Sequence, residues 1–442
     1  MSDGAAHLAL AALGPLYQGY AYSYPHKGAY RTLSPRQRLR SVWSTEAKDR
    51  LFLYVHVPFC EMRCGFCNLF TTANPEGSLI ERYLAAIERE ALTASEELGP
   101  SRAVQMAIGG GTPTFLDPNA MEKLFDLTSS LFGADPARIP ASVETSPKTA
   151  QLERIRILFD RGVERISIGA QSFFEDEVRA MGRPQKTAEL ETALDTIRRF
   201  PFERLNIDLI YGAASQTPET WCASVRRALA WRPEELYLYP LYVRAGTGLD
   251  RRAQVEDAHR LALYRAGRDL LLSEGYEQMS MRAFRRKGSQ GGSALEYCCQ
   301  EDGMLGIGAG ARSYTRALHY STEYAVSRSG VLSILDEYCA RDTEAFRYAS
   351  HGFELSADER ARRYVLKSIL RREGLDSTRF AATFGEAPRA ALPQLMQLEQ
   401  LGLIEEQDGA LVPTDAGLEQ SDAIAPFLYS TSVRNLTQSD VR

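Results

Sequence analysis

The chain of 442 residues lacks several features that would place it in common classes of protein. It has no run of about 18 apolar residues, so no membrane-spanning helix is expected, and its start lacks the basic segment of a secretory signal. No block of Lys and Arg stands out and the formal net charge is −5, which argues against a broad basic surface for nucleic acid. The 7 cysteines are an odd number, which does not indicate a disulfide framework. We therefore expect a cytoplasmic protein with reduced thiols.

Three of the cysteines lie close together, and they are the most informative feature that is present. Cys60, Cys64 and Cys67 have the spacing C-x3-C-x2-C and follow an apolar, strand-like stretch over residues 51–57. Cysteine thiolates hold iron–sulfur clusters, and three protein ligands would leave one iron of a four-iron cluster open to a substrate. Zinc is the nearer alternative, but structural zinc normally has four ligands. His56 could supply the fourth, although its place inside the strand pattern favours an ordinary strand side chain.

The rest of the chain shows an alternation of short apolar stretches and helical patterns. Helices such as 79–98 and 121–132 lie between strands expected over residues 51–57, 104–108, 141–144, 165–169, 204–210, 235–239 and 276–281. This alternation predicts βα units around a parallel sheet. The carboxyl ends of such strands carry the chemistry in full or partial barrels.

The region after about residue 355 has a different pattern. It predicts helices over residues 359–371, 377–383 and 389–401 and then a hairpin over residues 403–413 with its turn at Asp408 and Gly409. Helices followed by a hairpin suggest a small winged-helix-like unit. Since it has no basic recognition helix, we interpret it as a lid or packing element.

These patterns divide the chain into four parts. We expect an irregular segment over residues 1–50, a barrel core over 51–290, a connecting segment that closes the barrel over 291–354, and a winged-helix-like domain over 355–442. The first segment is rich in tyrosine and could line a substrate opening or simply cap the barrel; its tyrosines include Tyr17, Tyr20, Tyr22 and Tyr24. The cysteines outside the triplet are expected to be buried or incidental, namely Cys222, Cys298, Cys299 and Cys339.

Five sequence words follow one another along the chain and narrow the interpretation of the triplet. They are residues 54–60 (YVHVPFC), 109–114 (GGGTPT), 169–173 (GAQSF), 206–212 (NIDLIYG) and 305–311 (LGIGAGA). With the triplet, they resemble the radical S-adenosylmethionine (SAM) superfamily. The resemblance is to the oxygen-independent coproporphyrinogen III oxidase group, which includes heme chaperones and class C methyltransferases. It covers about residues 50–430 and implies an α/β fold with a partial (β/α)6 barrel.

The resemblance also implies a cofactor set and a reaction. A [4Fe–4S] cluster would be held by Cys60, Cys64 and Cys67, and SAM would chelate the open iron. An electron from a donor such as flavodoxin or ferredoxin would then split SAM into methionine and a 5′-deoxyadenosyl radical, which takes a hydrogen atom from a small-molecule substrate. Positions that match SAM contacts of the family are Tyr54, Gly110, Gly111, Thr112, Glu144, Gln171, Arg183, Asp208, Ile210 and Tyr239.

Several of these positions also have a chemical reason to belong to a site. Glu144 ends a predicted strand, where a carboxylate could bind a ribose hydroxyl or an ammonium group. A guanidinium such as that of Arg183 fits a carboxylate. Asp208 lies in an apolar strand, where a charge is costly unless it is paired. The resemblance places Ile210 and Tyr239 beside a second SAM molecule.

Two departures from the family pattern bear on the function. The oxidases carry a fourth cysteine two residues after the third, where this chain has Leu69, which weakens an assignment to porphyrin biosynthesis. Heme chaperones carry a His-Asn pair where this chain has Ser293 and Ala294, and neither is a strong ligand for heme iron. Three classes therefore remain: a coproporphyrinogen-oxidase-like oxidoreductase, a two-SAM enzyme for methyl transfer or cyclopropane formation, and a disfavoured heme chaperone.

Overall fold

The computed structural model describes residues 13–18, 23–244, 246–249, 255–289 and 303–439. The chain forms two compact units. The barrel unit comprises Arg31–Gln254 and Gly288–Gly352, and the C-terminal unit comprises Met1–Tyr30, Val255–Lys287 and Phe353–Arg442. The expected division into four consecutive parts therefore differs from the compact units, because the second unit is assembled from three separate stretches of chain.

A mixed sheet organises the barrel unit, with strand order β1-β15-β14-β13-β12-β2-β5-β6-β7-β8-β9. The strands from β12 to β9 run parallel to their neighbours. These parallel strands are β12 (Met304–Ile307), β2 (Leu51–Val57), β5 (Ala103–Gly110), β6 (Ala141–Thr145), β7 (Arg165–Gln171), β8 (Arg204–Tyr211) and β9 (Glu235–Pro240). All but β12 begin within one residue of a predicted strand, and the βα alternation is confirmed.

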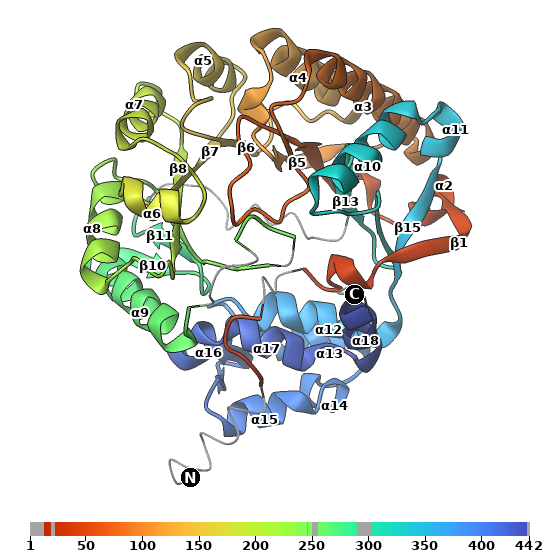
Figure 1. The fold of residues 1–442 in the computed structure, drawn as a ribbon. Coiled ribbons are helices and arrows are strands. Elements are labelled where there is room, and N and C mark those ends of the chain that lie inside the picture. Colours follow the sequence, from red (N-terminus) through yellow and green to blue (C-terminus); the bar gives the residue numbers. More distant parts are fainter. Residues whose placement is uncertain (1–12, 19–22, 245, 250–254, 290–302, 440–442) are drawn as a thin grey trace. The chain divides into compact units, whose positions relative to one another are not determined.

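Helices follow the parallel strands and form an outer ring around them (Figure 1). They are α3 (Gly77–Leu98), α4 (Pro118–Phe132), α5 (Leu152–Asp160), α6 (Glu175–Ala180), α7 (Thr187–Arg198) and α8 (Pro218–Leu229). Because they cover the outside of the sheet, β2 needs apolar residues on that face, which explains its nearly continuous apolar sequence. The fold is the predicted α/β partial barrel.

The prediction of an irregular segment over residues 1–50 is wrong for the second half of that range. It contains the strand β1 (Arg31–Arg38) and the helix α2 (Leu39–Val42), besides the short turns η1 (Lys27–Ala29) and η2 (Lys48–Arg50). β1 is an edge strand that is mostly exposed and pairs with β15 (Tyr348–Glu354). An exposed edge strand has no buried face and tolerates a proline, here Pro35, so its sequence lacks the alternation that marks a strand.

Antiparallel strands continue the sheet on the other side of β12. They are β13 (Arg312–Tyr314) and β14 (Leu318–Ser321), and they are followed by the helices α10 (Arg328–Ala340) and α11 (Thr343–Phe346). The short strands β3 (Phe59–Cys60) and β4 (Thr72–Ala73) pair with each other and enclose the cysteine loop, residues 60–70.

The C-terminal unit combines helices with a three-stranded sheet of order β16-β18-β17. The hairpin of β17 (Ile404–Gln407) and β18 (Ala410–Pro413) turns at Asp408 and Gly409, both with positive φ, as predicted. The other elements are α12 (Ala357–Ile369), β16 (Leu375–Asp376), α13 (Ser377–Phe384), α14 (Pro388–Ala391), α15 (Gln394–Gln400), α16 (Asp415–Glu419), α17 (Ser421–Leu428) and α18 (Thr431–Ser439). The predicted helix over 389–401 is in fact α14 and α15, separated at Pro393, which cannot continue a helix from its N-terminal side.

Two other segments belong to this unit. Helix α9 (Asp257–Ser273) precedes a hairpin of β10 (Tyr276–Gln278) and β11 (Ala283–Arg286), so the strand expected over 276–281 is half of an antiparallel pair. Tyr24 is almost fully buried, and its backbone carbonyl accepts a hydrogen bond from Arg363. Tyr24 is therefore part of the core of this unit and does not line an opening, whereas Tyr20 and Tyr22 lie outside the described residues.

Within the described ranges, no helix combines the length and the apolar character that crossing a membrane requires.

Candidate functional site

The cysteine loop leaves the carboxyl end of β2 and is fixed by neighbouring loops. The backbone N–H of Gly65 donates to the carbonyl of Gly182 (3.1 Å), and the Gly65 carbonyl accepts from Leu249 (2.9 Å). A Cβ on Gly65 would lie 2.8 Å from the Met181 carbonyl oxygen, so a larger residue would push these loops apart. The Tyr324 hydroxyl donates to the carbonyl of Asn68 on the other side of the loop. The loop is therefore anchored on both sides.

Two thiols of the triplet, those of Cys60 and Cys64, each accept a hydrogen bond from a polar side chain. The sulfur of Cys60 accepts from the Thr112 hydroxyl (3.6 Å), and that of Cys64 accepts from Arg183 Nη1 (3.4 Å). Desolvation raises the pKa of the Cys60 thiol to about 12, and it also raises the pKa of Cys64. Metal binding has to displace these protons, and the bound metal then holds the thiolate form.

The arrangement of the thiols fits a cluster better than a single metal ion. No three Cys, His, Asp or Glu side chains in the described part of the chain are close enough to share one ion. A zinc ion needs its sulfur ligands at about 2.3 Å, whereas in a cubane cluster each cysteine binds a different iron. His56 is not a fourth ligand: its Nε2 interacts with the Phe70 carbonyl (2.9 Å) and its Nδ1 with the Tyr54 hydroxyl (3.2 Å). His56 is buried, as expected for a strand side chain.

The glycine turn after β5 lies directly against the cysteine loop. Gly110 has φ 112°, and a Cβ there would lie 2.5 Å from the His56 ring. A Cβ on Gly111 would lie 2.9 Å from the sulfur of Cys60. These glycines therefore bring the backbone of β5 close to the predicted cluster ligands, which a larger residue would prevent.

The inner face of the parallel strands is more exposed than the outer face. Register pairs place the side chains of Glu144, Asp208 and Tyr237 on one face of the sheet, and that face is opposite to the one covered by the helices. The strand residues with partial or full exposure on that face are Gly306, Tyr54, Ala107, Glu144, Gly169, Gln171, Asp208, Tyr237 and Tyr239. Their neighbours on the other face are buried. The inner face of the strands is therefore partly open to solvent toward their carboxyl ends, and we call this region, which holds many of the predicted site residues, the hollow.

Two carboxylates face this hollow from different strands. Glu144 accepts a hydrogen bond from the backbone N–H of Gly110 (3.2 Å), and Asp208 accepts one from Asn206 Nδ2 (2.7 Å). Desolvation, with a further contribution from the Asp208 charge, raises the pKa of Glu144 to about 7. Desolvation also raises the pKa of Asp208. Although Glu144 is exposed, the surrounding protein still disfavours its negative charge.

Gln171 and Arg183 lie next to each other at the end of β7. The register of β7 against β8 shifts between Gly169 and Gln171, and Gln171 has φ 66°, a conformation that costs free energy for a residue other than glycine. Arg183 is buried, and its Nη2 donates to the Gly169 carbonyl (2.8 Å). It is therefore an interior residue of the site rather than a surface charge. Its Nε donates to Gln185 (2.8 Å), a residue that the sequence gave no reason to select.

An apolar cluster lies at the ends of β8 and β9. The buried Ile210 packs there with the partly buried Tyr239, Phe66 and Val243. Phe66 belongs to the cysteine loop, so this cluster joins the loop to the hollow. Both residues that the resemblance assigned to a second SAM molecule thus lie together. Leu69, at the position of the missing fourth cysteine, is 50% exposed.

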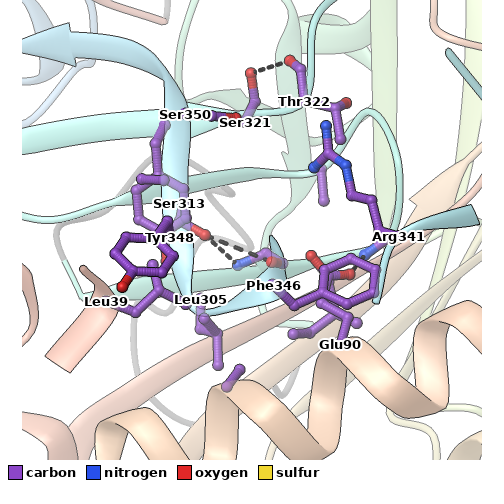
Figure 2. A pocket seen from close by; sticks show the side chains of 17 residues that line it. Leu39, Glu90, Leu305, Ser313, Ser321, Thr322, Arg341, Phe346, Tyr348 and Ser350 are labelled. Carbon is purple, nitrogen blue, oxygen red and sulfur yellow. Dashed lines mark hydrogen bonds between the residues drawn. The ribbon is translucent and has the colours of Figure 1, made fainter. Parts of the chain in front are cut away.

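A separate small cavity of about 40 Å³ lies between α3 and the strands β12 to β15 (Figure 2). Glu90 lines it and accepts hydrogen bonds from the Gly308 backbone N–H and the Tyr338 hydroxyl, both at 2.6 Å. Its other lining residues include Arg341, Ser313 and Tyr348. None of the residues around it belongs to the cysteine loop. The turn after β12 lies close to the cysteine loop, because a Cβ on Gly310 would lie 2.6 Å from Phe70 at the end of that loop.

Charged residues deeper in the hollow were missed by the sequence analysis. Arg165, Arg204 and Glu235 are buried and lie on the same strand face as Asp208. Each of the three is the first residue of its strand, whereas Asp208 lies amid apolar strand residues, so a charge within an apolar strand, the signal that selected Asp208, does not select them.

Comparison with known proteins agrees with this arrangement. Residues 54–228 match the Radical SAM superfamily, and residues 355–419 match the HemN C-terminal domain. The oxygen-independent coproporphyrinogen III oxidase of Pseudomonas aeruginosa is 27% identical, over 81% of this chain and 79% of its own length. The heme chaperone HemW of Bacillus subtilis is 26% identical, over 82% of this chain and 95% of its own length.

A solved structure shows the same fold. Coproporphyrinogen III oxidase from Escherichia coli, described as a radical SAM enzyme, matches with a TM-score of 0.75 and 23% identity, covering 90% of this chain and 96% of that one. Together with the cysteine triplet and the two family matches, this leads to one conclusion. The chain belongs to the radical SAM superfamily as an enzyme of the coproporphyrinogen III oxidase-like group, which uses a [4Fe–4S] cluster and SAM.

Proposed function

We propose that SAM binds in the hollow of the barrel unit, next to a cluster held by Cys60, Cys64 and Cys67. The observation that carries this proposal is the exposure pattern of the strands, which leaves polar inward-facing positions open while the outward-facing ones are buried. Glu144 and Asp208 supply acceptors for an ammonium group and for ribose hydroxyls. Arg183 supplies donors for a carboxylate.

The residues of this chain then act by binding and orienting. When bound, the cluster supplies the electron that splits SAM and starts hydrogen abstraction from a small molecule. The glycine turn brings backbone groups of β5 close to SAM, and Arg183 contacts both the hollow and Cys64. We infer that a small redox protein such as flavodoxin or ferredoxin delivers the electron.

A second candidate function is carbon transfer with two SAM molecules. The apolar cluster of Ile210, Tyr239, Phe66 and Val243 favours it, because it offers an apolar surface beside the hollow. A heme-carrier function is disfavoured, although one relative is named a heme chaperone. Ser293 and Ala294, which stand in place of the chaperone's His and Asn, lie outside the described residues.

The experiment that tests the proposed function is SAM cleavage after anaerobic reconstitution of the cluster. With SAM and dithionite, the protein is expected to form 5′-deoxyadenosine, measured by liquid chromatography, even without its substrate. Glu144→Gln and Asp208→Asn are expected to lower the rate, whereas Glu153→Gln, an exposed change on α5, is the matched control. No 5′-deoxyadenosine from a protein with a full cluster would contradict the proposal. A one-to-one heme complex that survives gel filtration would favour the chaperone.

A further inference from the structure

The inner face of the barrel unit carries an ion network in the half that is formed by β6 to β9. The interior of a barrel is usually filled by branched apolar side chains. Here the half near β2 is filled by aromatic and other apolar side chains, since Phe52 and Tyr54 pack with Met304 and Ala107. The other half carries buried Arg165, Arg204 and Glu235 instead. Buried charges are expensive to desolvate, so their concentration on one side needs a reason.

Arg165 is the centre of this network. Its Nε donates to Glu235 Oε2 (2.8 Å), and its Nη1 donates to the Ser142 hydroxyl (3.0 Å). Its guanidinium also lies 5.8 Å from the ring centroid of Tyr237. Ser142 lies on β6 and both Glu235 and Tyr237 lie on β9, so the contacts come from strands on the two sides of β7. The guanidinium is therefore held in one place by neighbouring strands.

The Arg165 guanidinium lies below the two carboxylates of the proposed SAM site. Ser142 is two residues before Glu144 on β6, and Glu235 is two residues before Tyr237, the register partner of Asp208. Ser167, the next inward-facing residue after Arg165, donates to Asp208 Oδ2 (3.4 Å) and accepts from Asn206 (2.7 Å). The positive charge of Arg165 lowers the pKa of both Glu144 and Asp208, against the desolvation that raises them.

We propose that Arg165 is a positioning residue for SAM binding: its buried charge, held by Glu235, favours the state in which Glu144 and Asp208 both face the hollow as anionic acceptors. The inference rests on the proposed function, because it takes SAM to bind at these two carboxylates. Two carboxylates in one site repel each other, and without a nearby cation one of them keeps a proton. A protonated carboxyl group offers a weaker acceptor to an ammonium group or a ribose hydroxyl.

Glu235 and Arg204 modulate the effect of the Arg165 charge on the two carboxylates. Glu235 partly neutralises Arg165, and Arg204 lies 3.8 Å from the other oxygen of Glu235. Removing the charge of Glu235 therefore strengthens the positive field at the carboxylates, and removing that of Arg165 weakens it. The other charged or titratable groups that face the hollow are Tyr54, His56, Arg183, Arg204, Tyr237 and Tyr239. These groups are unchanged in the Arg165 and Glu235 variants described below, so a difference in SAM affinity between those variants reports on the ion network.

The test is the pH dependence of SAM affinity, measured by equilibrium dialysis on reconstituted, unreduced protein between pH 5.5 and 8.5. Affinity is expected to fall toward low pH as the carboxylates take up protons. Arg165→Met is expected to move the midpoint of this fall upward by about one pH unit, and Glu235→Gln to move it downward. Arg165→Lys, which keeps the charge, is expected to leave the midpoint near that of the wild type. At pH 7, Arg165→Met is then expected to bind SAM about fivefold more weakly, with a much smaller difference at pH 8.5.

The possible outcomes distinguish a failure of this inference from a failure of the proposed SAM site. If Glu144→Gln and Asp208→Asn bind SAM like the wild type at every pH, SAM does not bind at these carboxylates, and both proposals are overturned. If they weaken binding but Arg165→Met lowers affinity equally at every pH, Arg165 has only a structural role. Should Arg165→Met fail to fold, Glu235→Gln decides alone, since an unchanged or raised midpoint would overturn the inference.

Discussion

The guanidinium of Arg183 donates a hydrogen bond to the sulfur of Cys64 across 3.4 Å. The Arg183 side chain therefore lies between the predicted cluster and the hollow, where its Nη2 donates a hydrogen bond to the Gly169 carbonyl. Because Arg183 contacts the Cys64 sulfur and lies at the hollow, the proposed function assigns it to the carboxylate of SAM, which it would orient toward the iron that has no protein ligand.

Replacement of Arg183 is therefore expected to weaken SAM binding. Arg183→Ala removes a charge-assisted hydrogen bond, worth about 1.5–3 kcal/mol, so the dissociation constant should rise roughly 10- to 150-fold. Equilibrium dialysis on protein with matched iron content measures it. Arg179→Ala is the control on the same segment, because Arg179 is exposed and pairs with Asp176. Unchanged SAM affinity in Arg183→Ala would remove Arg183 from the site.

The cluster ligands give the second prediction. Alanine at Cys60, Cys64 or Cys67 should abolish a reconstituted cluster of about four irons per chain, as measured by iron and sulfide analysis. Cys222→Ala and Cys339→Ala change cysteines outside the triplet, on α8 and α10, and should leave the iron content unchanged. A full cluster in the triple Cys→Ala variant would disprove the assignment.

The sequence was sufficient for the parallel strands other than β12 and for the cysteine loop, because both depend on local patterns. The stretch over residues 51–57 is apolar throughout and coincides with β2. β1 could not be predicted, since its exposed residues form a strand only by pairing with β15, more than 300 residues later in the chain. The left-handed conformation of Gln171 likewise depends on a register shift between β7 and β8 that no local pattern encodes.

The pairing of β1 leads to a prediction about stability. Glu97 on α3 is buried and pairs with Arg38 of β1 and with Arg347, and these bonds lower its pKa to about 2. A lowered pKa contributes stability that is present above the ordinary carboxyl range and is lost as the pH falls toward 2. Glu97→Gln should therefore cost about 1.5–3 kcal/mol at pH 7, with a smaller loss near pH 3, in urea unfolding. The control is Glu96→Gln, whose exposed carboxylate also pairs with Arg347 and should change stability by less than about 1 kcal/mol.

Glu144 gives the opposite dependence on pH. Its pKa is raised from 4.5 to about 7 in the folded chain, mainly by desolvation. The folded state therefore binds a proton more tightly than the unfolded state, so this residue favours folding below pH 4.5 and that contribution is lost as the pH rises toward 7. In unfolding measurements without SAM, Glu144→Gln should lose this dependence between pH 5 and 7, whereas the exposed change Glu153→Gln should retain it. Parallel pH curves for wild type and Glu144→Gln would show that the carboxyl group titrates normally.

Leu69 leads to a prediction about the substrate. Leu69 stands where the oxidases carry a fourth cysteine, and it is half exposed at the end of the cysteine loop. Since the cluster already has three ligands, Leu69→Cys should leave the iron content unchanged. We expect poor or absent conversion of coproporphyrinogen III by the wild type, measured by chromatography of the porphyrin products after oxidation. Robust conversion would show that the fourth cysteine is dispensable and would assign the chain to the oxidases.

The two enzyme classes differ in the fate of the SAM methyl group. A carbon-transfer enzyme would move methyl label into its product and release S-adenosylhomocysteine together with 5′-deoxyadenosine. An oxidase would release carbon dioxide and 5′-deoxyadenosine, with no label in the product. If carbon transfer is correct, replacing Tyr239 by Ala in the apolar cluster should lower label transfer more than it lowers the formation of 5′-deoxyadenosine, because only the second SAM molecule would lose its contact. Equal losses of both products would argue that the cluster of Ile210, Tyr239, Phe66 and Val243 serves the first SAM molecule or the substrate instead.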